Sequence, residues 1–486
     1  MDGEAKLAKP IKFGTDGWRG IIADEFTGDR LDRVVPIAAQ VLAETFPEAQ
    51  RTVVVGYDRR FLSPEFAQRA ADNLVGHGFN VLLSTTDAPT PAFSWAAHER
   101  QMIGALVITA SHNPAIYSGL KIKGTFGGSV ALPVTQAVEQ RVNGGEVLPP
   151  GAGAITPFDP WESYGAALGQ KVDRSAIRAL LETGRLRVFV DAMHGVTAGG
   201  LARLLGSEGG IQELHTHRDP LFGGHPPEPL PQYLNQLAAA LRSHQEQHPD
   251  CLCVGFIFDG DGDRIAAMDG AGTFLSSQIL IPILIEHLTV GRGWTGEVIK
   301  TISGSELMGH VAKFHHLPVY ETPVGYKYIA ERMLSGVPVL LGGEESGGIG
   351  YRDHIPERDA LLSALYLLEA IARTELDLSQ QYRLLQERSQ FFHAYDRTDV
   401  HLRDLSARDR LLELLASQPP TELAGRAVTE LTAPDGYKFR LADDAWLLVR
   451  FSGTEPLLRL YCEAPTPAAV GELLGAIAQW VTTALS

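Results

Sequence analysis

The stretch CLCVGFIFDGDGDR, residues 251–264, joins an apolar run to a loop in which three aspartates alternate with two glycines. The run has the length and composition of a buried strand. The glycines let the backbone bend, so the carboxylates of Asp259, Asp261 and Asp263 can converge on one point. Such carboxylates repel one another without a cation, and their oxygens suit a hard cation such as Mg²⁺. The stretch therefore predicts a metal-binding loop at the end of a strand.

An EF-hand loop also begins with Asp-x-Asp-x-Asp, but it needs Gly at its sixth position and Glu at its twelfth. Here Arg264 and Gly270 occupy those positions, which argues against an EF-hand. A solvated acidic turn is the other alternative, and the cost of uncompensated like charges disfavours it. Arg264 would lie beside the metal and hold either a phosphate or the acidic cluster.

Length and composition narrow the class of protein. A chain of 486 residues is too long for one core and indicates three or four domains. The formal net charge of −16 argues against general nucleic-acid binding, so a site for small anions must be locally basic. Apolar runs long enough for a membrane span and a signal-peptide core are both missing. With three cysteines, a reducing cytoplasm is the expected location.

Apolar runs alternate with amphipathic helical stretches over most of the chain. One helix is expected at residues 63–76, with Ser63 as its cap and Pro64 in its first turn. This rhythm predicts repeated βαβ units and an α/β fold. The predicted strands include residues 52–56, 80–83, 105–109, 187–190, 252–258 and 337–341.

Three composition changes predict domain boundaries. A Pro/Gly-rich stretch covers residues 147–160, a second boundary follows the acidic loop, and a third follows a helical run at 360–373. The last part has strand patterns near 437–441, 445–451 and 457–462 and a final helix at 467–483. We therefore expect α/β domains at 1–150, 151–272 and 273–385 and a smaller α+β domain at 386–486.

Four unusual loops each directly follow a predicted strand. In α/β proteins, ligands bind beyond the carboxyl ends of strands. One such loop in each domain predicts a central cleft where all four domains meet. The loops are TASHNP at 109–114, DGDGDR at 259–264, GEESGG at 343–348 and SGTEP at 452–456.

The first loop contains a candidate nucleophile. Ser111 carries a hydroxyl on a tight turn beside His112, so it could be a nucleophile or a phosphate carrier. An Asx-type turn explains the same residues nearly as well. Lys121 is a candidate general acid or base, because basic neighbours would lower its pKa. A solvated surface lysine is the alternative reading.

The third and fourth loops predict ligand contacts. Glu344 and Ser346 could hydrogen-bond sugar hydroxyls, although a plain glycine-rich turn is an equal alternative. The fourth loop and its neighbours combine hydroxyls, backbone N–H groups and two arginines, which are the parts of a phosphate cradle. Its members are Arg450, Ser452, Gly453, Thr454 and Arg459.

Other motifs carry weaker signals. The turn FGTDGWRG at 13–20 contains Arg19, a further candidate contact to phosphate. The stretch DAMHG at 191–195 follows a strand, and we prefer a structural or interdomain role for it. A nucleotide triphosphatase is disfavoured because the chain lacks a Walker-type Gly-x-x-x-x-Gly-Lys-Ser/Thr motif.

Together, the four loops resemble those of the α-D-phosphohexomutase superfamily, in the same order and over the whole chain. TASHNP looks like its phosphoserine loop, and DGDGDR looks like its metal loop. GEESGG looks like its sugar-binding loop, and Arg450 with SGTEP looks like its phosphate-binding loop. The family has four domains around a central cleft, the first three α/β and the last a smaller α+β domain.

The subgroup is less sharply marked. The motif TPVGYK at 322–327, which includes Lys327, and the Glu-Glu-Ser loop look closest to phosphoglucomutases. Phosphoglucosamine mutases usually carry a Gln-Ser version of the sugar loop, and dual phosphomannomutases a Met-Ser version. Tyr326 stands where many glucose-preferring relatives have another aromatic residue, which leaves mannose use open.

The resemblance implies an isomerase that interconverts glucose 1-phosphate and glucose 6-phosphate. Ser111 would be phosphorylated and glucose 1,6-bisphosphate would be the bound intermediate and activator. Mg²⁺ would bind Ser111, Asp259, Asp261 and Asp263. Lys121 would move the proton, with His112, Arg19 and Arg264 supporting the transferred phosphate. The sugar and its second phosphate would be held by Glu344, Ser346, Lys327, Arg450, Ser452, Gly453, Thr454 and Arg459. We expect a monomer or weak homodimer.

Other functions fit the same residues. Within the family they are phosphomannomutase, phosphoglucosamine mutase and hexose 1,6-bisphosphate synthase. Outside it, a metal-dependent phosphatase would use the serine, aspartates and arginines but would release phosphate to water. A Ca²⁺-stabilised sugar-binding protein would leave Ser111 without a role.

Overall fold

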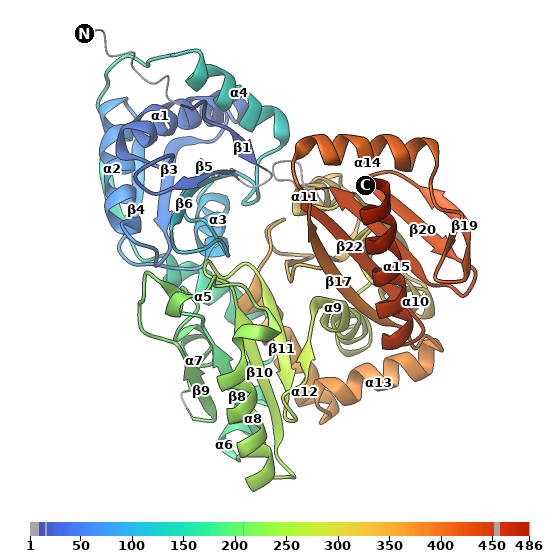
Figure 1. Cartoon of the computed structure of the whole chain (residues 1–486). Coiled ribbons are helices and arrows are strands. Elements are labelled where there is room, and N and C mark those ends of the chain that lie inside the picture. The colour runs from blue at the N-terminus through green and yellow to red at the C-terminus, as the bar shows by residue number, and fades with distance from the viewer. Residues whose placement is uncertain (1–8, 15–16, 208, 452–456, 486) are drawn as a thin grey trace.

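The computed structural model describes residues 9–14, 17–207, 209–451 and 457–485. Four β-sheets form in four successive parts of the chain, which we call domains I to IV (Figure 1). The first three are α/β domains, and domain IV is an antiparallel sheet covered by helices. The predicted fold class is confirmed.

Domain I is a seven-stranded mixed sheet in the order β1-β2-β6-β5-β3-β4-β7. Alternate side chains of β3 enter two different cores, Val53 and Val55 with α1, α2 and α4, and Val54 with α3. The helices therefore cover both faces of the sheet. The strands are β1 (Phe13–Gly14), β2 (Gly17–Ile21), β3 (Gln50–Tyr57), β4 (Asn80–Ser84), β5 (Met102–Ile108), β6 (Tyr117–Gly124) and β7 (Ile155–Phe158), and the helices are α1 (Gly28–Thr45), α2 (Ser63–Gly76), α3 (Thr90–Glu99) and α4 (Leu132–Asn143).

The predicted helix at 63–76 is α2, but the predicted cap is wrong. Leu62 is the N-cap residue, in a left-handed conformation, and Ser63 is already helical. The Ser63 hydroxyl instead donates to Asp58 Oδ1 at 2.7 Å. A buried carboxylate five residues upstream has taken the hydroxyl that would otherwise cap the helix.

The first sheet extends past the predicted boundary at residue 150. Strand β7 pairs in parallel with β4, with Val81 opposite Ile155. Its Pro157 lowers the strand signal in the sequence, yet proline is tolerated because β7 is the edge strand.

Domain II has the strand order β12-β11-β10-β8-β9. The run predicted as a buried strand is β10, which pairs with β8 in parallel and with β11 in antiparallel. The strands are β8 (Leu186–Asp191), β9 (Ile211–Leu214), β10 (Leu252–Phe258), β11 (Ile265–Asp269) and β12 (Phe274–Leu275), and the helices are α5 (Pro160–Lys171), α6 (Arg174–Glu182), α7 (Gly200–Leu205), η1 (Phe222–Gly224), η2 (Pro231–Tyr233) and α8 (Asn235–Gln247).

Domain III has the strand order β14-β13-β15-β16. The predicted boundary at residue 385 falls inside α13, because Asp377 and Gln380 form a capping box and the helix continues to Ser389. The strands are β13 (Glu297–Thr301), β14 (Val319–Thr322), β15 (Val339–Gly343) and β16 (Ile349–Tyr351), and the helices are α9 (Ser277–Glu286), η3 (His287–Gly291), α10 (Glu306–Phe314), α11 (Tyr326–Leu334), α12 (Ala360–Thr374) and α13. Helix α13 spans Leu378–Ser389.

Domain IV is an antiparallel sheet in the order β17-β22-β21-β20-β19-β18. One helix in the described part of the chain, α15, is long and apolar enough to cross a membrane, but one of its faces is buried in the domain IV core. The elements are β17 (Ala394–His401), α14 (Leu405–Ser417), β18 (Glu422–Leu423), β19 (Arg426–Thr432), β20 (Tyr437–Leu441), β21 (Trp446–Phe451), β22 (Leu457–Ala464) and α15 (Pro467–Leu485).

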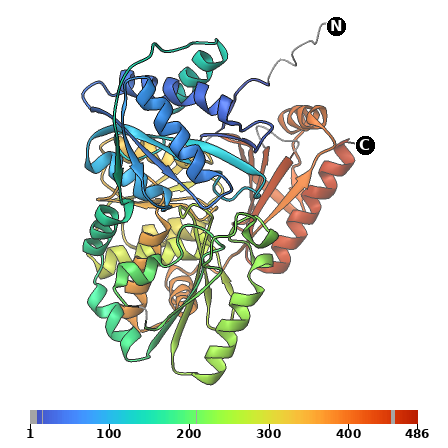
Figure 2. The same ribbon diagram turned by 90° about the vertical axis from the view of Figure 1, so that its left-hand side faces the viewer.

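Domain IV has its own core, whereas the largest apolar cluster is shared by domains I to III. The largest apolar cluster runs from Val54 of β3 through Val254 of β10 to Leu361 of α12. The domain IV core is separate, and a small cluster of Ile302 and Trp446 with two further side chains joins it to domain III. Figure 2 shows domain IV at one side of the molecule, beside the other three.

Candidate active site

The loop after β5 and the loop after β10 meet at Ser111. The serine has a left-handed backbone, with φ of +52°, and its N–H donates to Thr109 Oγ1 at 2.9 Å. Its hydroxyl donates to Asp259 Oδ2 at 2.8 Å across the interface between domains I and II. Residues 148 positions apart in the sequence thus form one polar site, as the four-loop pattern predicts.

Arg60 holds the Ser111 loop in place and was missed in the sequence. Its buried guanidinium donates to the backbone carbonyl oxygens of four loop residues and pairs with Asp58 at 3.2 Å. The accepting carbonyls belong to Ser111, Asn113, Pro114 and Tyr117. Because Asp58 and Arg60 follow the end of β3, the rule that selected the other loops could have selected this one.

The three aspartates of the DGDGDR loop converge as predicted. Asp259, Asp261 and Asp263 are buried, and one carboxylate oxygen from each lies within 4.8 Å of the others. Asp259 Oδ1 accepts two backbone N–H bonds, from Asp263 and Arg264, which closes the loop on itself. Burial and the neighbouring carboxylates raise the pKa of Asp259 well above its ordinary value.

The triad fits a divalent cation. Among the residues that the structure describes, Oδ1 of Asp261 and Oδ1 of Asp263 are buried oxygens with no hydrogen-bond partner. Burying unsatisfied carboxylate oxygens is costly, and a cation held by hard oxygen ligands would remove that cost. The donor set of three carboxylates and a serine oxygen suits Mg²⁺ better than a softer metal.

Lys121 is part of this cluster and is not a solvated surface lysine. It lies on β6, is buried, and its ammonium is 2.8 Å from Asp261 Oδ2 and 2.7 Å from Asp263 Oδ2. Burial acts to raise the pKa of Asp261, but the charge and hydrogen bond of Lys121, with the Thr90 hydroxyl, outweigh it and lower that pKa. Lys121 therefore stabilises the ionised form of Asp261.

His112 and Arg19 surround the same serine. His112 Nδ1 lies 3.3 Å from Ser111 Oγ. Burial, followed by the nearby charges of Arg264 and Arg19, lowers the pKa of His112 well below its ordinary value, so the ring is neutral near pH 7. Arg19 donates to the side-chain oxygen of Asn113 on the serine loop. The predicted cluster around Ser111 is therefore assembled.

The metal loop and the GEESGG loop are linked through Arg358, which sequence reasoning missed. Arg358 Nη2 is 2.8 Å from Asp263 Oδ2 and Nη1 is 3.3 Å from Glu344 Oε1. Glu344 is buried and also accepts from the Ser346 hydroxyl at 2.8 Å. Burial raises the pKa of Glu344 despite Arg358 and Arg264. Nothing in the sequence around Arg358 distinguishes it, because only the fold places it between the two loops.

Arg264 also lies between these loops. It forms a backbone bridge with Gly348, and Ile265 N–H donates to Gly347 O at 3.0 Å. The charge of Asp263 raises the pKa of Arg264 against the opposing effect of burial. Arg264 is thus held against the acidic cluster, which was one of its two predicted roles.

Two residues of the TPVGYK segment, Tyr326 and Lys327, lie in different environments. Tyr326 is buried beneath the Arg358 guanidinium, with 5.4 Å from that group to its ring centre. Lys327 is half-buried in the first turn of α11, with Nζ 4.8 Å from the Tyr328 ring. Tyr326 therefore supports Arg358 from within the protein, whereas Lys327 lies beside Tyr328.

One face of the domain IV sheet carries a row of arginines. Arg450 of β21 lies directly opposite Arg459 of β22, which in turn lies opposite Asp399 of β17. Like charges facing each other are unfavourable, and Asp399 and Asp435 compensate them at the two ends. The predicted residues Ser452, Gly453 and Thr454 lie outside the described residues. Arg450 and Arg459 nevertheless present guanidinium groups, which are suited to binding phosphate.

Four family models match successive parts of the chain. Three describe the alpha/beta/alpha domains I, II and III of phosphoglucomutase/phosphomannomutase, at residues 10–147, 162–272 and 276–388, and the fourth its C-terminal domain, at 414–479. The chain belongs to the phosphoglucomutase/phosphomannomutase family. Members of this family are hexose-phosphate mutases, a class of isomerase.

Individual relatives cover nearly the whole chain. A phosphoglucosamine mutase of Halorhodospira halophila is 30% identical, over 97% of this chain and 96% of its own. A phosphoglucomutase/phosphomannomutase of Thermococcus kodakarensis is 28% identical, over 95% and 96%. A solved structure from Thermus thermophilus, provisionally assigned as a phosphomannomutase, is 33% identical with a TM-score of 0.84, over 98% and 100%. The names of these relatives differ in the sugar, so they leave its identity open.

Proposed function

We propose that the protein interconverts glucose 1-phosphate and glucose 6-phosphate through a phosphorylated Ser111. The observation that carries this proposal is the Ser111 hydroxyl, 2.8 Å from a buried three-aspartate cluster that Arg358 links to Glu344. A nucleophile, a metal cluster and a polar sugar loop in one network are the parts that phosphoryl transfer to a sugar needs.

In the proposed reaction, Ser111 carries the phosphoryl group that is exchanged with the sugar. A sugar hydroxyl oxygen bonds to phosphorus and the bond between phosphorus and Ser111 Oγ breaks. The Lys121 ammonium gives a proton to the departing Oγ and is restored by the proton of the sugar hydroxyl. Mg²⁺ bound by Asp259, Asp261, Asp263 and the Ser111 phosphate would neutralise negative charge on the transferred group. Arg60 fixes the serine backbone. The neutral His112 ring and the Arg19 guanidinium support the phosphate.

The reaction requires the bound sugar to be held in two orientations. Glucose 1,6-bisphosphate is the proposed intermediate, and it must turn so that its other phosphate reaches Ser111. Glu344 and Ser346 present a carboxylate and a hydroxyl to the sugar in both orientations. Arg450, Arg459 and Lys327, with the loop Ser452, Gly453 and Thr454, would bind the phosphate that is not reacting.

The preference for glucose rests on the Glu-Glu-Ser sequence of the sugar loop. Glucosamine phosphate is the second candidate, because the relative from Halorhodospira halophila carries that activity in its name. Glu344 is compatible with either sugar, since a carboxylate can accept a hydrogen bond from a hydroxyl or an ammonium group.

A coupled assay tests the proposal. Glucose 6-phosphate formation from glucose 1-phosphate is measured with Mg²⁺ and trace glucose 1,6-bisphosphate, for wild type and Ser111→Ala, with mannose 1-phosphate and glucosamine 1-phosphate in parallel. We expect turnover that is fastest with glucose and lost in Ser111→Ala. Release of free phosphate would instead indicate a phosphatase, and faster turnover of another sugar would overturn the glucose assignment.

A further inference from the structure

We propose that His194, His217 and Asp219 form a second metal site, in domain II, for a borderline transition-metal cation such as Zn²⁺. The site is distinct from the aspartate triad in its position and in its donor atoms. It gives a structural role to the DAMHG stretch, which the proposed reaction does not use.

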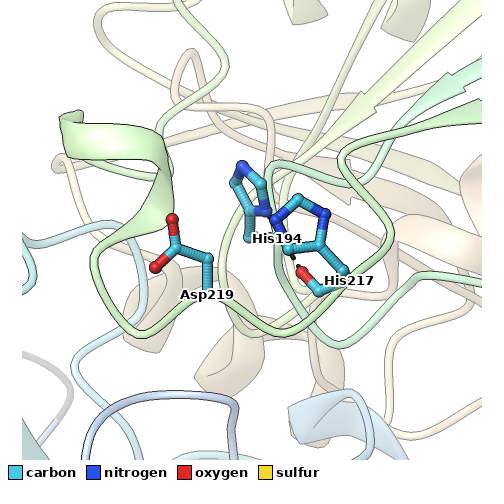
Figure 3. A group of neighbouring side chains, drawn as sticks. All are labelled: His194, His217 and Asp219. Carbon is cyan, nitrogen blue, oxygen red and sulfur yellow. Dashed lines mark hydrogen bonds between the residues drawn. The ribbon is translucent and has the colours of Figure 1, made fainter.

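The three side chains come from two loops beside the carboxyl end of β8. His194 follows β8, and His217 and Asp219 lie between β9 and η1. The loops are joined by the N–H of His194, which donates to His215 O at 2.9 Å. Figure 3 shows the two imidazole rings close together with the Asp219 carboxylate beside them.

The His194 ring is held in the tautomer that a metal ligand needs. Its Nδ1 lies 3.1 Å from the His217 carbonyl oxygen, which can only accept a hydrogen bond, so Nδ1 carries the proton (Figure 3). Nε2 of the neutral ring then has a free lone pair. Backbone carbonyls commonly orient metal-bound histidines in this way. His194 is buried, so little entropy would be lost when a metal binds it.

Asp219 is held in place by two backbone N–H groups. Its two carboxylate oxygens accept the N–H groups of Leu221 and Gly223, each at 2.9 Å. These two bonds fix the position of the carboxylate. Each oxygen keeps a further lone pair. In the described part of the chain, no hydrogen bond or ion pair joins this carboxylate to either imidazole, so the three donors converge without satisfying one another.

The geometry and chemistry favour Zn²⁺ over Mg²⁺. One donor atom from each residue lies within 4.8 Å of the others, whereas donors around tetrahedral Zn²⁺ are about 3.3 Å apart. The exposed His217 side chain can rotate to close this difference, and water can fill the fourth position. Two imidazoles and one carboxylate suit zinc, whereas Mg²⁺ prefers oxygen ligands.

A metal here would stabilise the segment that supports the two active-site loops. Residues on both sides of Asp219 contact Arg60. After it, the Phe222 ring centre lies 4.9 Å from the Arg60 guanidinium carbon. Before it, Arg218 donates to Arg60 O at 2.8 Å. Farther along the same segment, Pro227 O accepts the N–H of Gly260 in the metal loop at 3.2 Å. A cation that ties this segment to the loop after β8 would therefore limit movement of both catalytic loops.

Metal titration of the full-length protein tests the proposal. The protein is stripped with a chelator and saturated with Mg²⁺, and Zn²⁺ binding is followed by calorimetry, Co²⁺ binding by visible absorption, and thermal stability with and without Zn²⁺. We expect one Zn²⁺ per chain and a higher midpoint of unfolding with Zn²⁺. His217→Ala and Asp219→Ala should each weaken binding at least about tenfold and abolish the stabilisation.

Two controls separate this site from others. His248→Ala removes one ring of a second histidine pair, His244 and His248, at the end of α8. Their ring centres are 4.6 Å apart. Asp261→Asn alters the aspartate triad. Both should bind Zn²⁺ as the wild type does. Undiminished binding in His217→Ala, or loss of binding in either control, would overturn the proposal. Mutase activity does not enter the test, so it is independent of the proposed function.

Discussion

Arg60 shows how one buried side chain can set the position of a nucleophile. Its guanidinium satisfies four backbone carbonyls of the Ser111 loop and pairs with one carboxylate. A lysine would keep the charge but could not make this planar set of contacts. The position of Ser111 therefore depends on a residue that contacts its loop through backbone carbonyl oxygens.

We expect Arg60→Lys to lower kcat by about a hundredfold, because displacement of a reacting group by about 1 Å costs that much. KM should change little, since the sugar and distal phosphate contacts remain. Arg59→Lys is the matched control, because Arg59 pairs with Asp87 at the surface of the same turn. Steady-state kinetics of both variants make the comparison. Equal losses of kcat in the two variants would contradict this role for Arg60.

Gly260 is required by the close approach of two loops. A Cβ atom there would lie 2.6 Å from the Ser111 carbonyl oxygen and 2.9 Å from Pro227 Cγ. Gly260→Ala should therefore displace the serine loop, lower kcat at least about tenfold and destabilise the protein by about 1–3 kcal/mol.

Gly471 on α15 offers a control for the alanine substitution itself. A Cβ there meets no atom within 4 Å, so Gly471→Ala should keep full activity and equal or greater stability. Thermal unfolding and kinetics of both variants decide the matter. Full activity in Gly260→Ala would show that the loops tolerate more separation than the structure indicates.

At the scale of elements, sequence patterns predicted the helices and strands whose bounds depend on neighbouring residues in the sequence. Helix α2 and strand β20 have the predicted bounds, because their apolar periodicity and flanking turn residues are strong. The cap of α2 was wrong because Asp58 competes for the Ser63 hydroxyl through tertiary contact. Strand β7 was missed because its pairing with β4, far away in the sequence, decides its conformation.

Glu306, in the first turn of α10, makes the contact between domains III and IV sensitive to acid. Burial acts to raise its pKa, but Lys300, Lys438 and Arg440 outweigh burial and lower that pKa to about 2. A carboxylate with a lowered folded-state pKa stabilises the protein above its unfolded-state pKa and loses that contribution as pH falls.

We therefore expect Glu306→Gln to be less stable than wild type by about 3 kcal/mol at pH 7. The difference should be constant above about pH 5 and shrink as pH falls towards 2. Thermal or denaturant unfolding of both proteins across this range measures it. A difference that is the same at pH 3 and pH 7 would contradict the assigned pairing.

At the scale of the whole molecule, domain IV is attached to domain III by a limited contact. A small apolar cluster meets the buried Glu463, which accepts hydrogen bonds from Ser305, the Glu306 N–H and Trp446. The order of the four loops predicted that all four domains contribute to one site. Of the residues that connect the loops, Arg60 follows the end of β3, so the same rule could have selected it. Arg358 could not be predicted, because only the packed domains place it between two loops.

We expect domain IV to close over the bound intermediate, since in the proposed reaction its arginine-bearing face would bind the distal phosphate. Glucose 1,6-bisphosphate should then slow hydrogen exchange at the Arg450 and Arg459 positions of β21 and β22. The buried strand β10 serves as an internal reference that should change little. Equal exchange in β21 and β22 with and without the bisphosphate would contradict closure.

The most direct test of the central claim follows the phosphate on Ser111. Protein phosphorylated by glucose 1,6-bisphosphate is mixed with glucose 1-phosphate and Mg²⁺ in a single turnover, and intact mass with peptide mapping tracks the phosphoryl group. We predict that Ser111 carries a phosphate, that this phosphate passes to the sugar and is replaced by the phosphate that the sugar carried, and that no phosphate is released to water. Unmodified Ser111 in a protein that still turns over glucose 1-phosphate would contradict the account.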